Sequence, residues 1–484
     1  MGSTGTGGWR RWATVAGVTV VLAGCGAAEP LPVWQPPTLG AAVTVAPGVG
    51  APGLGDPYYP GAGNGGYDVA HYDLGLTYDP AGHRITARAS IEATALVALS
   101  RFNLDLHGLI VASATVAGQP ATVSRAGDEL TVTPAAPLAA GAAFTTVIEY
   151  SGAPTAYREP GLSGGEGFVQ HDEGALALGQ PEGAASWFPC NDHPSDKATY
   201  DISLTVPGDL AALSNGVLVG KVKHDGHTTW RWETHSPMAT YLATAVIGDY
   251  EVRSGTHDGM PVIIAVATGL PDTVSDAIDR TPEILDFLET KFGPYPFDTV
   301  GGIVHDDTDM RFALENQTRP VYVSSFFVGP KPPVTVIAHE LAHQWYGDSV
   351  SVRDWRDIWL NESFATYAGW LWAEKEYRRP LATSFNNAYD SAEPEVWTIP
   401  PANPGREHLF SDSVYDRGAM TLYALKEAIG DAAFDRILTG WPVEHRDGNV
   451  STADFIAYAE KISGKQLDDL FQAWAYGTTK PPKP

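Results

Sequence analysis

The chain has 484 residues, of which 44% are hydrophobic and 18% charged, a composition typical of a globular protein with two or three domains. Acidic residues outnumber basic ones by 57 to 31, which gives a formal net charge of −26 at pH 7. A surface this negative repels phosphate backbones, so the composition argues against nucleic-acid binding. It is compatible with cationic partners, such as peptides with a free amino terminus, and equally with a simple role in solubility.

The first 25 residues predict a signal peptide. Arg10 and Arg11 form a short basic region, and the apolar run over residues 13–22 is about half as long as a membrane-spanning helix. The run ends in Leu-Ala-Gly-Cys25, which resembles the lipobox of bacterial lipoproteins, where the cysteine is lipidated and becomes the first mature residue. We therefore expect an extracytoplasmic protein anchored to a membrane through lipid on Cys25. An ordinary cleaved signal with an incidental cysteine is the alternative.

Residues 26–66 are rich in Pro, Gly and Ala and carry only two charged side chains, Glu29 and Asp56. Such a stretch buries little apolar surface, so we interpret it as a disordered linker. Residues 67–253 consist of short runs of alternating apolar and polar residues, separated by Gly, Pro, Asn and Asp. This alternation predicts an antiparallel β domain.

From residue 254 the apolar residues recur with helical spacing, which predicts a mainly α domain over residues 254–478 and a frayed tail over 479–484. Proline and glycine mark several helix ends, for example Pro332 before one helix and Gly347 after it. The predicted helices cover residues 274–291, 332–346, 357–377, 416–430, 431–438, 452–463 and 467–476.

The helix predicted over residues 332–346 carries the motif His339-Glu-Leu-Ala-His343. Side chains four residues apart lie on one helix face with Cβ atoms about 5–6 Å apart, so both imidazoles can bind one zinc ion. Glu340 lies one step round the helix, where it can accept a proton from the attacking water as general base. A catalytic zinc takes three protein ligands. Glu362, separated from His343 by eighteen residues and located at the start of the next predicted helix, is the expected third ligand.

At these residues the sequence resembles the aminopeptidase N family of gluzincins, peptidase family M-one. The resemblance covers about residues 67–477 and includes the metal helix, His339-Glu-Leu-Ala-His-Gln-Trp-Tyr-Gly, and the third-ligand helix, Trp-Leu-Asn-Glu362-Ser-Phe-Ala. Ser363 stands where glycine is usual in the family. The resemblance implies an α+β multidomain fold, in which a saddle-like antiparallel β-sheet domain precedes a mainly α, thermolysin-like catalytic domain. It also implies one zinc ion per chain.

The exopeptidase motif of the family, Gly-x-Met-Glu-Asn, corresponds here to Phe312-Ala-Leu-Glu-Asn. In the family this motif lies on a strand beside the substrate, where its glutamate binds the free α-ammonium. The resemblance therefore implies that Ala313, Glu315 and Asn316 bind substrate. A carboxylate at a fixed distance from zinc favours a charged amine and disfavours an internal peptide bond. Phe312 in place of glycine leaves the shape of the first side-chain pocket open.

Two further segments match the family. In Gly-Gln180-Pro-Glu182, the resemblance implies that Glu182 is a second amine-binding carboxylate and that Gln180 lies beside the substrate side chain. In Val-Tyr415-Asp-Arg-Gly-Ala, it implies that the tyrosine donates a hydrogen bond to the oxyanion of the tetrahedral intermediate. The helical domain that caps the cleft in many members has no counterpart after Gly477. We therefore expect a more open cleft, or one closed by another subunit.

The combined prediction is a zinc-dependent aminopeptidase that hydrolyses the N-terminal peptide bond of peptides, with Glu340 as general base and Tyr415 as oxyanion donor. A zinc endopeptidase and an epoxide hydrolase similar to the leukotriene-hydrolase branch are alternatives on the same metal. A non-catalytic, surface-binding lipoprotein is a further alternative from a different functional class. The sequence gives neither the preferred first residue nor the oligomeric state.

Overall fold

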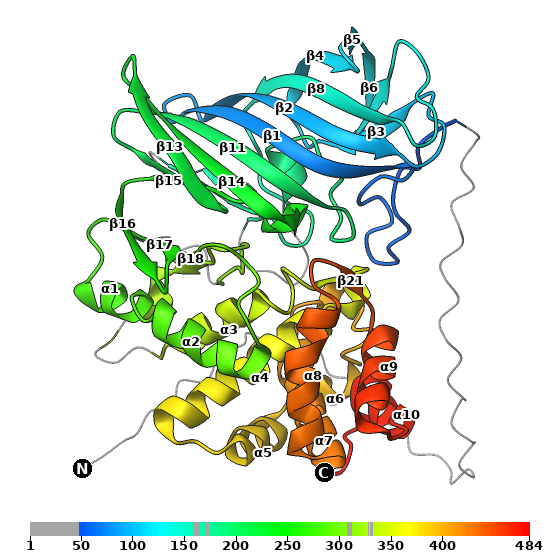
Figure 1. Ribbon diagram of the computed structural model, residues 1–484, viewed down its shortest axis with the longest axis vertical. Helices are drawn as coiled ribbons and strands as arrows, with labels where there is room; N and C mark the ends of the chain where they lie inside the picture. Colours follow the sequence, from blue (N-terminus) through cyan, green and yellow to red (C-terminus); the bar gives the residue numbers. More distant parts are fainter. Residues whose placement is uncertain (1–47, 158–164, 171–173, 307–311, 328, 330–332) are drawn as a thin grey trace, which may run out of the picture. The chain divides into compact units, whose positions relative to one another are not determined.

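A computed structural model describes residues 48–484 except 158–164, 171–173, 307–311, 328 and 330–332. Cys25 and the predicted signal peptide lie outside the described residues. In Figure 1 the strands of the first half of the chain lie above a mainly helical second half. No helix in the described part of the chain is long and apolar enough to cross a membrane.

The first half is built on an eight-stranded sheet with the order β13-β14-β11-β1-β2-β8-β4-β5. Burial alternates along β1, the pattern of a strand with one face on the core and the other in solvent. Adjacent strands are antiparallel except β1 and β11, which run parallel with Leu74 opposite Ile202. The strands are β1 (Tyr67–Asp79), β2 (Arg84–Ala95), β4 (Ile110–Val116), β5 (Gln119–Pro120), β8 (Ala143–Gly152), β11 (Lys197–Pro207), β13 (Val217–His224) and β14 (His227–Ala239).

Two smaller sheets complete the β domain. One has the order β3-β7-β6, and the other has the order β12-β15-β10-β9 and leads into the segment that carries Gln180. Their strands are β3 (Phe102–Asp105), β6 (Thr122–Ala126), β7 (Glu129–Thr133), β9 (Gly167–Gln170), β10 (Ala175–Leu178), β12 (Ala211–Ser214) and β15 (Ala245–Gly248).

The second half contains a four-stranded sheet in the order β16-β17-β18-β19, in which two helices separate β17 from β18, and further helices and a small β20-β21 pair follow. Because β16 begins at Tyr250, the sheet of the second domain starts before the boundary expected at residue 254. The strands are β16 (Tyr250–His257), β17 (Met260–Ala267), β18 (Val300–His305), β19 (Val321–Val323), β20 (Ser351–Val352) and β21 (Asn449–Val450). The helices are α1 (Asp272–Ile278), α2 (Thr281–Phe292), α3 (Thr335–His343), α4 (Trp359–Tyr377), α5 (Leu381–Ser391), α6 (Pro394–Thr398), α7 (Gly418–Ile429), α8 (Asp431–Glu444), α9 (Thr452–Ser463) and α10 (Asp468–Phe471).

The predicted helix over residues 274–291 is two helices, α1 and α2. Pro282 lies in the first turn of α2, where proline is favoured because its missing N–H has no partner to bond there. The predicted helix over 416–430 begins with a wider, π-helical turn at Ser413–Arg417 before α7. The helix over 452–463 agrees with α9, whose capping box is formed by Ser451 and Asp454.

The linker interpretation is wrong for residues 48–66, which we call the strap. Asp56 and Tyr59 are 3% and 1% exposed, and Asn64 is fully buried. The backbone of Pro52 and Gly53 forms bridges with Asn64, so the strap folds back on itself. Its Pro and Gly residues therefore shape an ordered turn, and its few polar and aromatic side chains provide the packing.

The prediction of a frayed tail is also wrong. The hydroxyl of Tyr389 on α5 donates a hydrogen bond to the carbonyl oxygen of Pro481 at 2.7 Å. Nζ of Lys480 lies 4.0 Å from the centre of the Tyr389 ring, and Nζ of Lys483 is 2.9 Å from the carboxylate of Asp390. Cation–π and ion-pair contacts thus fix the last residues against α5.

Candidate metal centre

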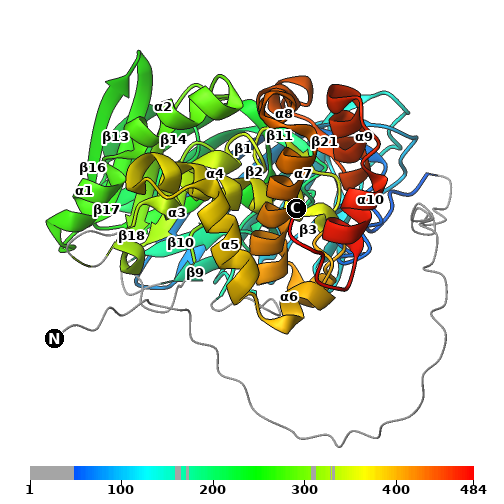
Figure 2. The ribbon, with the colours of Figure 1, turned by 90° about the horizontal axis from the view of Figure 1, so that it is seen from below.

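Two neighbouring helices carry the predicted metal ligands. α3 holds His339 and His343, and α4 holds Glu362 in its first turn. α3 and α4 lie side by side in both Figure 1 and Figure 2. The ring of Tyr346, just after α3, stacks on that of Phe364 on α4 with centroids 4.1 Å apart, which fixes the distance between the two elements.

The three ligand atoms fit a zinc ion. Nε2 of His339 and Nε2 of His343 each lie 3.4 Å from Oε2 of Glu362. Tetrahedral zinc, with bonds of about 2.0–2.2 Å, holds its ligand atoms roughly 3.3–3.6 Å apart. Nδ1 of His343 lies 3.0 Å from the carbonyl oxygen of Tyr346, a contact that leaves Nε2 free to bind metal.

The charge states of Glu362 and His339 suit a bound cation. Burial acts to raise the pKa of Glu362, but His343 and His339 beside it lower that pKa to about 2. Burial lowers the pKa of His339, which favours the neutral imidazole that metals bind. An ionised carboxylate and a neutral imidazole are thus present at two of the proposed ligand positions. Burial lowers the pKa of His343, but Glu315 and Glu362 outweigh it and raise that pKa well above its usual value, so metal binding at His343 displaces a proton.

Gly347 forms the turn of the backbone that follows the metal-binding helix. Its φ of +143° lies in the region that glycine tolerates and other residues rarely adopt. A Cβ atom there would lie 3.3 Å from Nδ1 of His343 and 3.4 Å from Nδ2 of Asn361. Glycine therefore lets the chain turn without displacing the histidine ring.

Glu340 faces the same centre. It is only 5% exposed, and its carboxylate lies within 4.8 Å of ligand atoms of Glu315 and His343. Burial raises the pKa of Glu340 well above its usual value; His343 opposes this rise and Glu315 adds to it. A carboxylate with a raised pKa holds a proton more readily, as a general base requires.

Glu315 is held from both domains. Nε2 of Gln180, from the β domain, donates a hydrogen bond to Oε1 of Glu315 at 3.0 Å. Nε2 of Gln344, one residue after His343, donates to the backbone oxygen of Glu315 at 2.9 Å. Sequence analysis gave no role to Gln344, although its place directly after the metal motif was the available signal. The metal helix thus fixes the backbone of the predicted amine-binding residue.

The rest of the exopeptidase motif lies in a less regular segment than expected. Ala313 is half-buried, and Leu314 forms an isolated β-bridge with Val321 in place of a regular strand. Asn316 is fully buried, and its Nδ2 donates to the carbonyl oxygen of Leu242 at 2.9 Å. Asn215 of the β domain donates to the Gln317 oxygen at 2.9 Å. The Asn316 side chain therefore connects the segment to the β domain.

Glu182 lies two residues beyond Gln180 and is partly exposed. Its Oε2 is 3.7 Å from a terminal nitrogen of Arg406, a residue that sequence analysis did not select. The charge of Arg406 was a weak signal by itself, because nothing in the sequence relates it to Glu182.

Tyr415 lies in the π-helical turn before α7, and its ring stacks against that of His339 with centroids 5.9 Å apart. Burial raises the pKa of Tyr415 well above its usual value, and Glu362 adds to the rise, so the phenol keeps its proton at neutral pH. Oγ of Ser363 donates to the oxygen of Val414 at 2.8 Å, which ties this turn to α4. The serine that replaces the usual glycine thus has a structural role.

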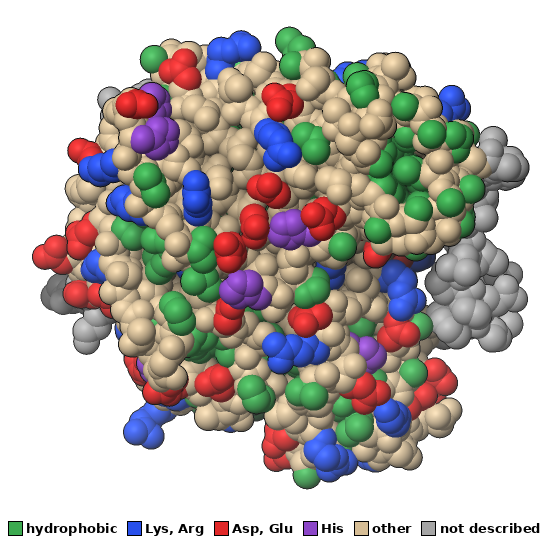
Figure 3. All heavy atoms as spheres, turned by 45° about the horizontal axis from the view of Figure 1, so that its top comes forward, with side chains coloured by type: hydrophobic (Ala, Val, Ile, Leu, Met, Phe, Trp, Pro, Cys, Tyr) green, Lys and Arg blue, Asp and Glu red, His purple; other side chains and the backbone are tan. Residues whose placement is uncertain are grey.

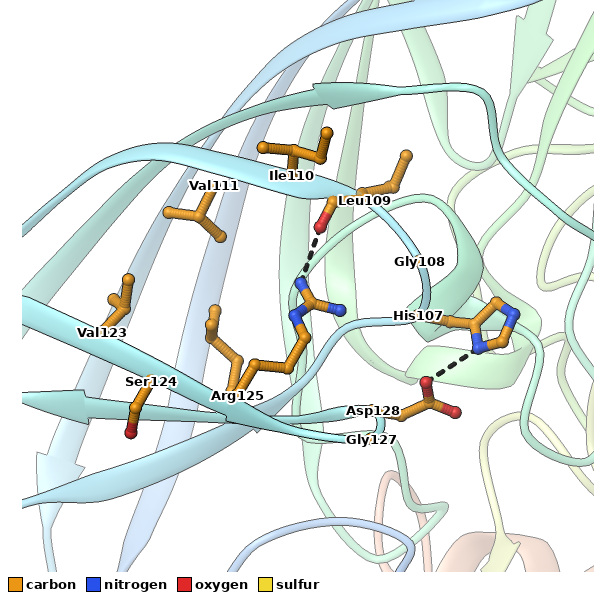
Figure 4. A pocket seen from close by; sticks show the side chains of 11 residues that line it. His107, Gly108, Leu109, Ile110, Val111, Val123, Ser124, Arg125, Gly127 and Asp128 are labelled. Carbon is orange, nitrogen blue, oxygen red and sulfur yellow. Dashed lines mark hydrogen bonds and ion pairs between the residues drawn. The ribbon is translucent and has the colours of Figure 1, made fainter.

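A pocket of about 500 Å³ lies elsewhere, in the β domain (Figure 4). Arg125 points into it and donates to the carbonyl oxygens of Leu106 and Leu109, the latter at 2.7 Å, while His107 pairs with Asp128 at 2.8 Å. These polar groups bond to the protein itself. None of the predicted site residues lines this pocket, so it is no alternative to the metal centre.

Comparisons with known proteins agree with this architecture. Residues 69–242 match a model described as the peptidase M1 N-terminal domain, and residues 276–474 match the peptidase family M1 domain. A crystal structure of an M1 zinc metallopeptidase mutant from Deinococcus radiodurans, bound to a Tyr-Ser-Ala substrate, is 31% identical with a TM-score of 0.82. The match covers 89% of this chain and 99% of that one. The chain belongs to peptidase family M1.

Among other members, aminopeptidase M1 of Arabidopsis thaliana is 29% identical over 62% of this chain and 36% of its own length. Glutamyl aminopeptidase of Homo sapiens is 28% identical over 61% of this chain and 33% of its own length. The chain thus matches about a third of the length of these curated relatives. The comparisons confirm the predicted family and the predicted order of a β-sheet domain followed by a mainly helical catalytic domain.

Proposed function

We propose that this M1 family member is a zinc-dependent aminopeptidase that removes the first residue of peptides with a free amino terminus. The observation that carries the proposal is the buried carboxylate of Glu315, within 4.8 Å of ligand atoms of Glu340 and His343. A carboxylate fixed beside the metal pairs with a substrate ammonium, and so restricts cleavage to the first peptide bond. The relatives that are named aminopeptidases support the same assignment.

His339, His343 and Glu362 would hold the zinc, which when bound supplies a Lewis acid for the peptide carbonyl and the attacking water. Glu340 accepts the proton of that water and passes it to the leaving amine. Tyr415 donates a hydrogen bond to the oxyanion as it forms. The role of Glu340 follows from its chemistry and its place beside His343, while that of Tyr415 is the one that the family resemblance implies and is supported by its stacking on His339.

Substrate binding in this proposal rests on the neighbouring segments. Glu315 and Glu182 bind the α-ammonium, and Gln180 orients Glu315 and lies beside the first side chain. Ala313 offers its backbone to the peptide. Asn316 supports the segment through the contact of its side chain with the β domain.

The test is an assay of the zinc-loaded full chain on paired peptides that differ only in a free or acetylated amino terminus. We expect release of the first residue from the free peptide, and cleavage of the blocked peptide at least about a hundredfold slower. Equal cleavage of both would refute amine recognition and favour an endopeptidase. Purified protein that holds no zinc and cleaves neither peptide would favour a non-catalytic binding protein.

We also propose that the protein is extracytoplasmic and is anchored to a membrane through lipid on Cys25. The supporting observations are the basic Arg10-Arg11 pair, the short apolar run after it and the lipobox-like end of that run. The full chain and its Cys25→Ser variant would be compared in membrane and soluble fractions. Equal membrane retention of both would contradict the proposal.

The surface charge supports peptides over nucleic acids as substrates. On the face in Figure 3, Lys and Arg side chains are scattered among Asp and Glu and form no continuous basic patch. With a net charge of −26, the protein repels polyanions and attracts cationic amino termini.

A further inference from the structure

The strap is anchored to the catalytic domain through the buried side chain of Asp56. Its carboxylate accepts hydrogen bonds from the backbone N–H groups of Tyr58 at 2.7 Å, Tyr59 at 3.0 Å and Trp355 at 2.7 Å. Trp355 lies in the short turn directly before α4, the helix that carries Glu362. Nε2 of His193 in the β domain lies 3.4 Å from the same carboxylate, so Asp56 joins the strap to both domains.

Tyr58 then fixes a loop of the catalytic domain. Its hydroxyl donates to Oδ1 of Asn403 at 2.5 Å and accepts from the backbone N–H of Gly405 at 2.8 Å. These residues are more than three hundred positions away in sequence. The strap therefore determines the path of the chain just before Arg406.

Arg406 itself lies between the strap and Glu182. Its guanidinium carbon is 4.3 Å from the centre of the Tyr59 ring, within the range of a cation–π contact. One terminal nitrogen is 3.7 Å from Oε2 of Glu182. The ring of Tyr59, in turn, packs edge-on against Trp355. The aromatic support and the carboxylate together leave the guanidinium few orientations.

We propose that Arg406, held by the strap, is a positioning residue for amine recognition: it restrains the orientation in which the carboxylate of Glu182 meets the substrate ammonium. The inference rests on the proposed aminopeptidase function. A guanidinium beside a carboxylate restrains its orientation, and a carboxylate has about four lone-pair sites, so it can accept from an ammonium as well as from other partners. Restraint before binding reduces the conformational entropy lost when the ammonium arrives.

This role predicts a separation of KM from kcat. In Arg406→Gln, KM for aminoacyl chromogenic amides should rise about threefold to tenfold, because an ammonium-binding group is less well placed. The turnover number should stay within about twofold, since the groups assigned to the scissile bond are Glu340, Tyr415 and the zinc ligands, and Arg406 is not one of them. Arg406→Lys keeps the charge but loses the planar stack on Tyr59, so its KM should lie between that of the wild type and that of Arg406→Gln.

A double-mutant cycle tests whether Arg406 acts through Glu182. Glu182→Gln alone should raise KM, and adding Arg406→Gln should raise it no further, because the group that Arg406 orients is already lost. Tyr58→Phe provides an independent variant that removes the hydrogen bonds to the 403–405 loop without altering Arg406 or Glu182. We expect it to raise KM in the same direction by a smaller factor.

The matched control is Arg353→Gln, which removes another partly exposed arginine, paired with Asp454 at 3.2 Å. It should leave KM unchanged, and thermal melting of every variant should separate a folding defect from a binding defect. Unchanged KM in Arg406→Gln, or additive effects of Arg406→Gln and Glu182→Gln, would overturn the positioning role. Failure of the proposed function itself would look different: the wild-type chain would cleave no substrate with a free amino terminus.

Discussion

The side-chain amide of Gln180 lies 3.0 Å from the carboxylate of Glu315, although 135 residues separate them and they belong to different domains. Both side chains are buried, with exposed fractions of 8% and 2%. Burial raises the pKa of Glu315; His343 opposes this effect and Glu362 adds to it. A buried carboxylate that has only neutral donors, here the Gln180 amide and the Tyr241 hydroxyl, gains from a cationic partner, and a substrate ammonium supplies one.

Glu315→Gln should therefore lower kcat/KM for peptides with a free amino terminus by at least about a hundredfold. An amide of the same shape keeps the contact with Gln180 but loses the charge that pairs with the ammonium. Steady-state kinetics on one peptide series would measure the loss. Zinc content should be unchanged, because Glu315 is not one of the three proposed ligands. A variant with wild-type kcat/KM would remove the basis for amine recognition at this residue.

Glu340→Gln should abolish measurable hydrolysis while zinc stays bound. The amide cannot accept the proton of the attacking water, a loss that general-base replacements place at about a hundredfold to ten-thousandfold. His339, His343 and Glu362 are untouched by the change, so metal analysis of the purified variant should still find one zinc per chain. Turnover close to that of the wild type would show that another group acts as the base.

Removal of zinc should destabilise the fold as well as stop activity. The two imidazoles and the Glu362 carboxylate converge within 4.8 Å in a buried site, so the metal binds the folded chain far better than the unfolded one. At free zinc a hundredfold above Kd, this linkage amounts to about 2.7 kcal/mol of unfolding free energy. Thermal melting with chelator, and again after zinc is added back, would measure how much zinc binding stabilises the fold.

Glu362→Gln is the matched variant for that experiment. It keeps the shape of the side chain but weakens metal binding, so added zinc should raise its Tm much less than that of the wild type. An equal rise in both proteins would mean that the zinc which stabilises the fold binds elsewhere.

Most of the metal site could be predicted from sequence because helical spacing determines how two of its three ligands lie. His339 and His343 must share a helix face, and a short return brings Glu362 opposite them. Glu315 and Tyr415 were recognised through family motifs, and the structure places both beside the triad. The hydrogen bonds around Glu315 could not be predicted in the same way, because the pairing of Gln180 with Glu315 depends on how the two domains pack.

The strap shows where sequence reasoning fails. Its Pro, Gly and Ala content matches that of a flexible linker, and composition records nothing about distant contacts. Asp56 and Tyr58 bond to residues 299 and 345 positions away, contacts that only the folded chain creates. Similarly, the side chain of Asn316 could equally have faced substrate or protein, and its bond to Leu242 places it in the domain contact.

Glu129 in the β domain should make stability depend on pH. Its carboxylate oxygens are buried without a hydrogen-bond partner among the described residues, and burial, with a smaller effect of Asp128, raises its pKa to about 7. The folded chain therefore keeps a proton that the unfolded chain, with a pKa near 4.5, has already lost. The stability that this carboxyl group contributes is fully present below pH 4.5 and is lost as pH rises through 7.

Glu129→Gln should flatten this part of the pH profile of stability and raise Tm at pH 8 relative to the wild type. Melting at pH 5 and pH 8 tests this, with the exposed Glu149→Gln as control. A Glu129→Gln profile parallel to that of the wild type would show that the carboxyl titrates alike in both states.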